Sequence, residues 1–281
     1  MRRDQKIRLK MIAAAACCAF SAAPQAAAAT FQGKEIEAGD TVKFGNYEQD
    51  NNADNGKEEI SWKVLEVDED AKTALLLSED CLDTMCYNID QESPDKAKET
   101  TWEDSSVRRW LNQDMPGGFY WEAFPKVDQN KIAETKVSAD PNGHFEDADP
   151  GKETKDKVFL LSEEEAGKYL GGKEDRIAHA SELTAEKLKK PDEDETEAEE
   201  DKGLPWSGSK DTEKETETEE EAEYYLDTQD TTGGLFWWLR TPGEDNTMAE
   251  CVGAEGSIVQ SGYLVNQLYF GIRPAIRVEV K

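Results

Sequence analysis

The chain has 281 residues and a formal net charge of −29 at pH 7, with 62 acidic against 33 basic residues. This balance argues against a nucleic-acid-binding protein, because phosphate contacts need basic surface patches. Only five cysteines and two histidines are present. These numbers argue against a disulfide framework and against a histidine-based metal site or catalytic triad. The sequence therefore predicts no resident metal and no cofactor.

The N-terminus is typical of a secretory signal peptide. A basic start, MRRDQKIRLK, precedes an alanine-rich apolar stretch and a small-residue end, the layout of a cleavable leader. The apolar stretch is too short and too weakly hydrophobic to span a membrane. We expect cleavage after Ala29, a mature chain without a transmembrane segment, and a secreted or cell-surface location. Lipid anchoring at Cys17 is the alternative.

The mature chain begins with three segments typical of β-strands. The second segment places apolar side chains at alternating positions, as expected for a strand with one buried face; these are Ile60, Trp62 and Val64, followed by Leu65 or Val67. Turn residues, including an Asn-Gly pair, separate the first two segments. We therefore predict an antiparallel meander over residues 41–47, 59–68 and 72–78.

The loop between the first two strands has some features of a calcium site. Asp50, Asn52 and Asp54 have the alternating spacing of calcium ligands. An EF-hand loop would require glycine at position 6 and glutamate at position 12, where this chain has Asn55 and Ser61. A hairpin turn accounts for the same residues without metal, so no calcium site is predicted here.

Two helices are expected in the middle of the chain. For the first, Thr101 is a candidate N-cap with Asp104 three residues later. Val107, Trp110 and Leu111 then form one apolar stripe at helical spacing.

The second helix is expected within residues 119–137, where several aromatic side chains lie near the start. Further on, Ser162 and Glu165 form a Ser-x-x-Glu capping box directly after an apolar strand. This pattern predicts a strand that runs into a helix.

Residues 186–223 have the composition of an acidic insertion within a single domain of residues 30–281. The segment 191–223 carries 16 acidic residues and 3 lysines and few apolar residues. Such a composition buries too little surface to offset the entropy of ordering. We expect a solvated, disordered insertion; a calcium-collecting or partner-binding arm is the alternative. Beyond it, glycine turns separate three further strand-like segments, 235–240, 250–265 and 269–280.

Six blocks in this order resemble a family of bacterial domains of unknown function. They are SWKVLE, LLLSED, TWEDSSVRRWLN, FLLSEEEA, WWLRTPG and GIRPAIRV, between about Val42 and Val280. The family has no assigned activity, so the resemblance implies none.

A more distant resemblance concerns the fold. The late tryptophan-rich strand, the glycine turns and the closing G-x-R-P strand are similar to the C-type-lectin-like and formylglycine-generating-enzyme group. The resemblance implies an α+β fold with an irregular antiparallel sheet and two helices. The calcium-coordinating triplets of the lectins are absent, and Cys251 stands alone where the enzymes have paired cysteines.

The candidate binding residues lie near the C-terminus. Trp237 and Trp238 are adjacent, so in a strand they point to opposite faces. We expect one to be in the core and the other to stack on a ligand or to be covered by a helix. Arg240 and Arg273 lie beside proline turns, where an arginine binds a ligand carboxylate or clamps neighbouring strands.

Three polar residues of the first predicted helix are interpreted in the same way. Of Arg108, Arg109 and Asn112, we expect one to pin a strand end and the others to face solvent.

Together these features predict an exported, monomeric, non-catalytic module that binds a protein or a glycan near Trp237, Trp238, Arg240 and Arg273. The alternative is a formylglycine-generating or other oxidoreductase enzyme, with Cys251 and Cys86 as metal or redox groups. Cysteines close together in a shared pocket would favour the enzyme. Cysteines that are scattered and buried would argue against it.

Overall fold

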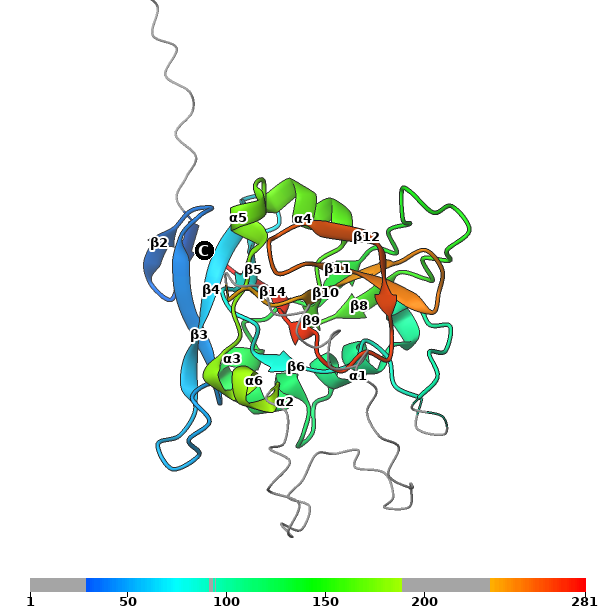
Figure 1. Ribbon diagram of the computed structural model, residues 1–281. Helices are drawn as coiled ribbons and strands as arrows, with labels where there is room; N and C mark the ends of the chain where they lie inside the picture. The colour runs from blue at the N-terminus through cyan, green and yellow to red at the C-terminus, as the bar shows by residue number, and fades with distance from the viewer. Residues whose placement is uncertain (1–28, 91–92, 94, 189–232) are drawn as a thin grey trace, which may run out of the picture.

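The computed structural model describes residues 29–90, 93, 95–188 and 233–281 (Figure 1). The predicted leader therefore lies outside the described residues except for Ala29, which begins strand β1 (Ala29–Phe31). Of the predicted acidic insertion, only residues 186–188 are described. The first two of these end helix α6 (Glu182–Lys187), and Leu188 is buried. The expected start of the insertion thus falls inside a helix.

The first sheet contains five strands, and every neighbouring pair in it is antiparallel. Their order is β3 (Thr41–Tyr47), β4 (Glu58–Asp68), β5 (Thr73–Ser78), β14 (Ala275–Glu279) and β9 (Val158–Phe159). The predicted meander of the first three strands is confirmed. The last strand of the chain extends this sheet beside β5.

Strand β4 shows why its sequence pattern is informative and where the pattern changes. Ile60, Trp62 and Val64 alternate into the core as predicted, and the indole Nε1 of Trp62 donates a hydrogen bond to the Phe44 carbonyl at 2.7 Å. A register shift between β4 and β5 follows Val64. An extra residue in one strand changes which face the next side chain occupies. Leu65 is consequently buried beside Val64.

The second sheet also contains five strands, in the order β12 (Ile258–Leu264), β11 (Met248–Val252), β10 (Trp237–Pro242), β13 (Gly271–Ile272) and β6 (Asp83–Thr84). Strands β10 and β13 are parallel, with Trp237 opposite Gly271, and the other pairs are antiparallel. The WWLR segment therefore pairs with the first part of the closing GIRPAIRV segment. The second part of that segment forms β14 in the other sheet, so these residues link the two sheets.

Two small antiparallel pairs complete the β structure. They are β1 with β2 (Lys34–Ile36), and β7 (Thr135–Val137) with β8 (Thr154–Asp156). Thr30 and Lys281 exchange backbone hydrogen bonds of 2.8 and 3.0 Å. The start of the described chain is thereby held against its C-terminus.

The described chain contains six short α-helices and one 3-10 turn, where the sequence predicted two helices in the middle of the chain and a further one after Ser162. They are η1 (Trp102–Asp104), α1 (Ser106–Asn112), α2 (Phe119–Ala123), α3 (Lys126–Gln129), α4 (Glu163–Tyr169), α5 (Lys173–Arg176) and α6. Figure 1 shows α4 and α5 at one end of the molecule, near β12, and α1, α2, α3 and α6 at the other end. Among the described residues, no helix is both long enough and apolar enough to cross a bilayer.

The predicted helix starts and stops are partly wrong. Thr101 makes no side-chain cap and precedes only η1, whereas α1 is capped by the Ser105 side chain, which accepts a hydrogen bond from the Arg108 amide at 3.2 Å. The second predicted helix is interrupted at Pro125, because a proline ring disfavours helical backbone at the residue before it.

The capping box at the start of α4 is confirmed. The Ser162 side chain accepts from the Glu165 amide at 3.2 Å, and the Glu165 carboxylate accepts from the Ser162 amide at 3.1 Å. The chain therefore runs from β9 into α4 as its sequence predicts.

Candidate ligand-binding site

The two adjacent tryptophans are both fully buried, at 0% exposure. Trp238 stacks on Phe270 with ring centroids 4.0 Å apart, and its Nε1 donates to the Met85 carbonyl at 3.1 Å. The Nε1 of Trp237 donates to the Arg176 carbonyl at 3.0 Å. A ring without exposed surface offers no face for an external ligand. Packing within the protein accounts for both side chains. Neither ring is left uncovered to stack on a ligand, as had been expected for one of them.

Arg240 and Arg273 are also buried, and both clamp the backbone. Arg240 donates to the carbonyls of Ser138 and Leu160 at 3.2 and 3.0 Å and pairs with the carboxylates of Asp140, at 2.6 Å, and Glu165. The guanidinium of Arg273 donates to the Ser78 carbonyl at 2.9 Å and lies 5.0 Å from the ring centroid of Trp237. Their donors are thus committed within the protein, as the strand-clamp alternative requires.

Two polar residues of α1 bond to neighbouring elements, although only one of the three was expected to do so. Asn112 bonds to β9 through its amide nitrogen, 2.8 Å from the Val158 carbonyl, and Arg108 pairs with Asp156 at 2.8 Å. Arg109 is exposed, as expected for the solvent-facing members of this group.

The three described cysteines are free and buried. Burial raises the pKa of Cys81 to about 12 and that of Cys86 to about 11, and it also raises the pKa of Cys251. All three are therefore protonated thiols at neutral pH, the form that is neither a nucleophile nor a metal ligand. In the described part of the chain, the one group of three clustered potential metal ligands contains no cysteine. This arrangement argues against Cys251 as a redox centre.

That group of potential ligands lies at the β3–β4 hairpin and differs from the one considered from sequence. The carboxylates of Glu48, Asp50 and Glu58 have oxygens within 4.8 Å of one another. They already accept hydrogen bonds from the loop: Glu58 from the Gln49 amide at 2.8 Å, and Asp50 from the Asn55 side chain at 2.6 Å. These bonds are what a hairpin loop needs, and they account for the acidic side chains without a metal.

Glu250 is a buried carboxyl group of a different kind. It is 0% exposed, and neither of its oxygens has a hydrogen-bond partner among the described residues. Burial, together with the nearby negative charge of Glu163, raises its pKa to about 9. Glu250 is therefore a neutral acid at pH 7, because the protonated form is the one that a site without partners tolerates.

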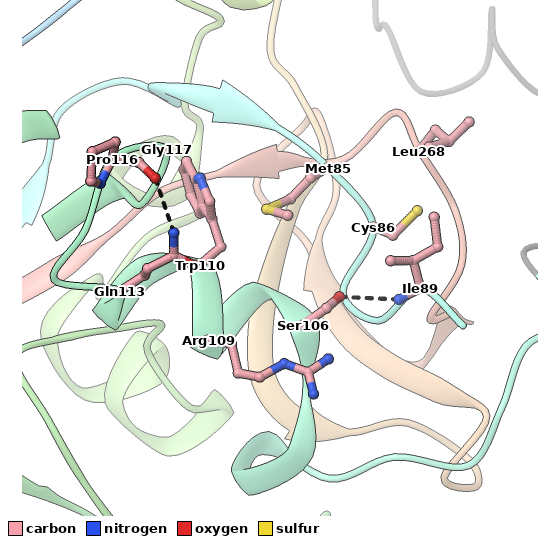
Figure 2. Close-up of a pocket in the computed structure, with 10 residues that line it drawn as sticks. All are labelled: Met85, Cys86, Ile89, Ser106, Arg109, Trp110, Gln113, Pro116, Gly117 and Leu268. Carbon is pink, nitrogen blue, oxygen red and sulfur yellow. Dashed lines mark hydrogen bonds between the residues drawn. The ribbon is translucent and has the colours of Figure 1, made fainter. Parts of the chain in front are cut away.

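A cavity of about 390 Å³ lies beside α1 (Figure 2). One of its walls is a single face of the helix, formed by side chains at i, i+3, i+4 and i+7: Ser106, Arg109, Trp110 and Gln113. The opposite wall is the segment after β6, and the loop after α1 and the β12–β13 loop complete the lining. The volume lies in the range of ligand pockets, roughly 300–1,000 Å³.

The helix α1 therefore has one face that packs in the core and a second face that lines the cavity. Val107 and Leu111 are buried in the core, while Trp110 is only partly buried and packs on Phe119 with ring centroids 5.6 Å apart. From its spacing, Trp110 was expected to share one apolar stripe with Val107 and Leu111. In the sequence, the helical spacing of Ser106 and Gln113 relative to Trp110 is the feature that could have indicated a second face of this helix.

Polar and apolar groups contribute nearly equal surface to the lining of the cavity. Met85, Ile89, Trp110 and Leu268 contribute apolar surface to the lining. Leu268 is 50% exposed, and Met115, next to the lining residue Pro116 in the chain, is 57% exposed. Exposed apolar side chains around a concavity mark interaction sites in soluble proteins.

Comparison with known proteins gives one match. A family model described as a domain of unknown function (DUF6273) matches residues 71–280. All residues that line the cavity lie within this range. Searches of curated proteins and of solved structures found no match.

Proposed function

The chain belongs to the family of the domain of unknown function DUF6273, and we propose that it is an exported, non-catalytic binding module for a protein ligand. The ligand places an apolar side chain in the cavity beside α1. Export follows from the leader-like residues 1–29. A C-type-lectin-like relationship is part of the same proposal and rests on the sequence pattern.

The observation that supports this function most directly is the exposed apolar rim around the cavity. Leu268, which lines the cavity, and Met115, the chain neighbour of the lining residue Pro116, each expose about half of their surface. A small molecule would fill the cavity and leave these side chains in water. A protein surface would cover them as well, as in interfaces where an anchor side chain fills a central pocket and its surroundings exclude water.

A protein ligand also fits the polar groups of the cavity better than a glycan does. The Ser106 hydroxyl accepts from the Ile89 amide at 3.1 Å, and the Gln113 amide donates to the Pro116 carbonyl at 3.2 Å. The Cys86 thiol is bonded to the Asn266 carbonyl at 3.1 Å. Apart from the Arg109 guanidinium, these lining groups leave few donors and acceptors for sugar hydroxyls, and each unpaired buried hydroxyl costs about 1–3 kcal/mol.

The lining also favours binding over catalysis. General acid–base catalysis needs a titratable group within reach of the substrate. The side chains that line the cavity include no histidine, aspartate or glutamate, and the Cys86 thiol is protonated at neutral pH because burial raises its pKa to about 11.

A selection from a random peptide library tests the proposal, with the full chain as bait. We expect recovered peptides to share an apolar side chain and to lose about tenfold or more in affinity for Leu268→Glu, because the new charge at the rim must be desolvated. Val127→Glu is the matched control: Val127 is an exposed apolar residue on α3, outside the cavity lining. Peptides that bind both variants equally well, or a glycan array that binds where peptides do not, would overturn the proposal.

A further inference from the structure

Arg109 differs from every other arginine in the described part of the chain. Five of the six arginines there donate hydrogen bonds from their guanidinium groups: Arg108, Arg176, Arg240, Arg273 and Arg277. The Arg109 guanidinium makes no hydrogen bond or ion pair with any described residue. Among the described arginines, Arg109 is therefore the one whose guanidinium donors are all left for water or for a ligand.

The position of Arg109 gives this free group a role. Arg109 lies on the same face of α1 as Trp110 and lines the cavity with it. In Figure 2 its side chain extends from the helix on the side where Ser106 meets Ile89. The lining therefore combines apolar side chains with a cationic edge, and no lining residue is an acid that would neutralise this charge.

We infer that the protein ligand carries a carboxylate next to the apolar side chain that enters the cavity, and that Arg109 binds this carboxylate. The inference rests on the proposed function, since it names the chemistry of the same ligand. A guanidinium presents a planar fork of donors that matches the two oxygens of a carboxylate. The apolar side chains of the lining strengthen such a pair by excluding water. A cationic ligand group would be repelled, and a neutral one would leave the donors of Arg109 in water.

Two probes that differ only in this group test the inference on the full chain. N-acetyl-L-phenylalanine has an aromatic side chain beside a carboxylate, and N-acetyl-L-phenylalaninamide has the same side chain beside a neutral amide. We expect the acid to bind about fivefold tighter than the amide by isothermal titration or NMR titration. N-acetyl-L-aspartate, which has carboxylates without an aromatic group, should not bind.

The variant Arg109→Gln should abolish the preference for the acid over the amide. It is expected to fold, because Arg109 is exposed and its side chain has no partner among the described residues. The matched control is Lys136→Gln, which removes the same charge on β7, where Lys136 is exposed and pairs with Glu153. The acid should retain its advantage in this control.

The outcomes separate the inference from the proposed function. Equal binding of acid and amide by the wild-type protein, unchanged in Arg109→Gln, would overturn the carboxylate inference and leave the cavity as a binding site. A preference that survives in Arg109→Gln would also overturn it. Binding of neither probe, together with failure of the peptide selection, would overturn both.

Discussion

Two single residues differ in what they contribute: Glu250 lowers the stability of the fold, whereas Arg109 is available to bind a ligand. Glu250 is buried without a hydrogen-bond partner among the described residues, so a cost in stability is built into β11. Glu163, whose charge raises the pKa of Glu250 further, lies at the start of α4. The exposed arginine of α1 has the reverse character, because it contributes nothing visible to the fold and is available to a ligand.

The pKa of Glu250 makes a prediction about pH. An unfolded glutamate has a pKa of roughly 4.3, whereas burial and the charge of Glu163 raise the folded value to about 9. Between these values the folded state holds a proton that the unfolded state lacks, so this residue lowers stability as pH rises from about 4.3 to 9. Glu250→Gln should unfold at the same urea concentration as wild type near pH 4 and be about 5 kcal/mol more stable near pH 8, because each pH unit above 4.3 costs the wild type about 1.4 kcal/mol.

Urea unfolding at a series of pH values gives this comparison. Glu244→Gln, at an exposed position after β10, controls for the loss of one acidic group. Parallel stability curves for wild type and Glu250→Gln would show that Glu250 finds a partner in solution.

For single residues, the sequence predicted to which side of a strand a side chain points, but not which residues it contacts. The adjacency of Trp237 and Trp238 correctly placed them on opposite faces of one strand. What covers each face comes from distant parts of the chain, Phe270 on one side and Arg176 on the other. Local spacing carries no information about such partners, so full burial of both rings could not be predicted from it.

Between elements, the Arg240 guanidinium joins β10 to the start of α4 and to the loop after β7. Its partners include the carboxylates of Asp140 and Glu165, which are only partly buried. Arg240→Met should destabilise the protein by about 3–5 kcal/mol, because removal of one member of a buried charge network leaves the others unpaired.

The matched variant is Arg277→Met, which breaks the more exposed pair with Glu66 on the first sheet. It should cost about 1 kcal/mol or less. Chemical denaturation of both variants measures the difference, and equal costs would contradict the role of Arg240 as a clamp between elements.

Elements were predictable from the sequence where their signals are local. The alternation of β4 and the capping box at Ser162 identified their elements correctly, since both depend on neighbouring residues. The split of the closing segment between β13 and β14 was missed, because strand order depends on contacts between distant parts of the chain. The face of α1 that lines the cavity was hidden for a related reason: Trp110 is apolar, and only the fold shows that one side of its ring is left uncovered.

For the whole molecule, the net charge of −29 opposes the approach of an acidic ligand even though one arginine binds its carboxylate. Salt shortens the range of this repulsion, from about 30 Å at 0.01 M to about 8 Å at 0.15 M. The association rate constant of a peptide with a carboxylate should therefore rise with ionic strength, while that of the corresponding amide changes little.

Stopped-flow measurements on the peptides recovered by selection test this expectation. A rate constant that falls as salt is added would mean that a positive surface steers the ligand to the cavity. That result would contradict a binding site in which Arg109 binds the carboxylate but the surrounding surface repels it.

The central claim is that the cavity beside α1 holds the ligand, and methionine methyl NMR tests it most directly. Met85 lines the cavity, and Met248 lies on β11, outside the lining. In protein labelled with 13C at the methionine methyl groups, N-acetyl-L-phenylalanine should shift the Met85 signal saturably and leave the Met248 signal in place. A Met85 signal that does not move, or a shift confined to Met248, would contradict the account.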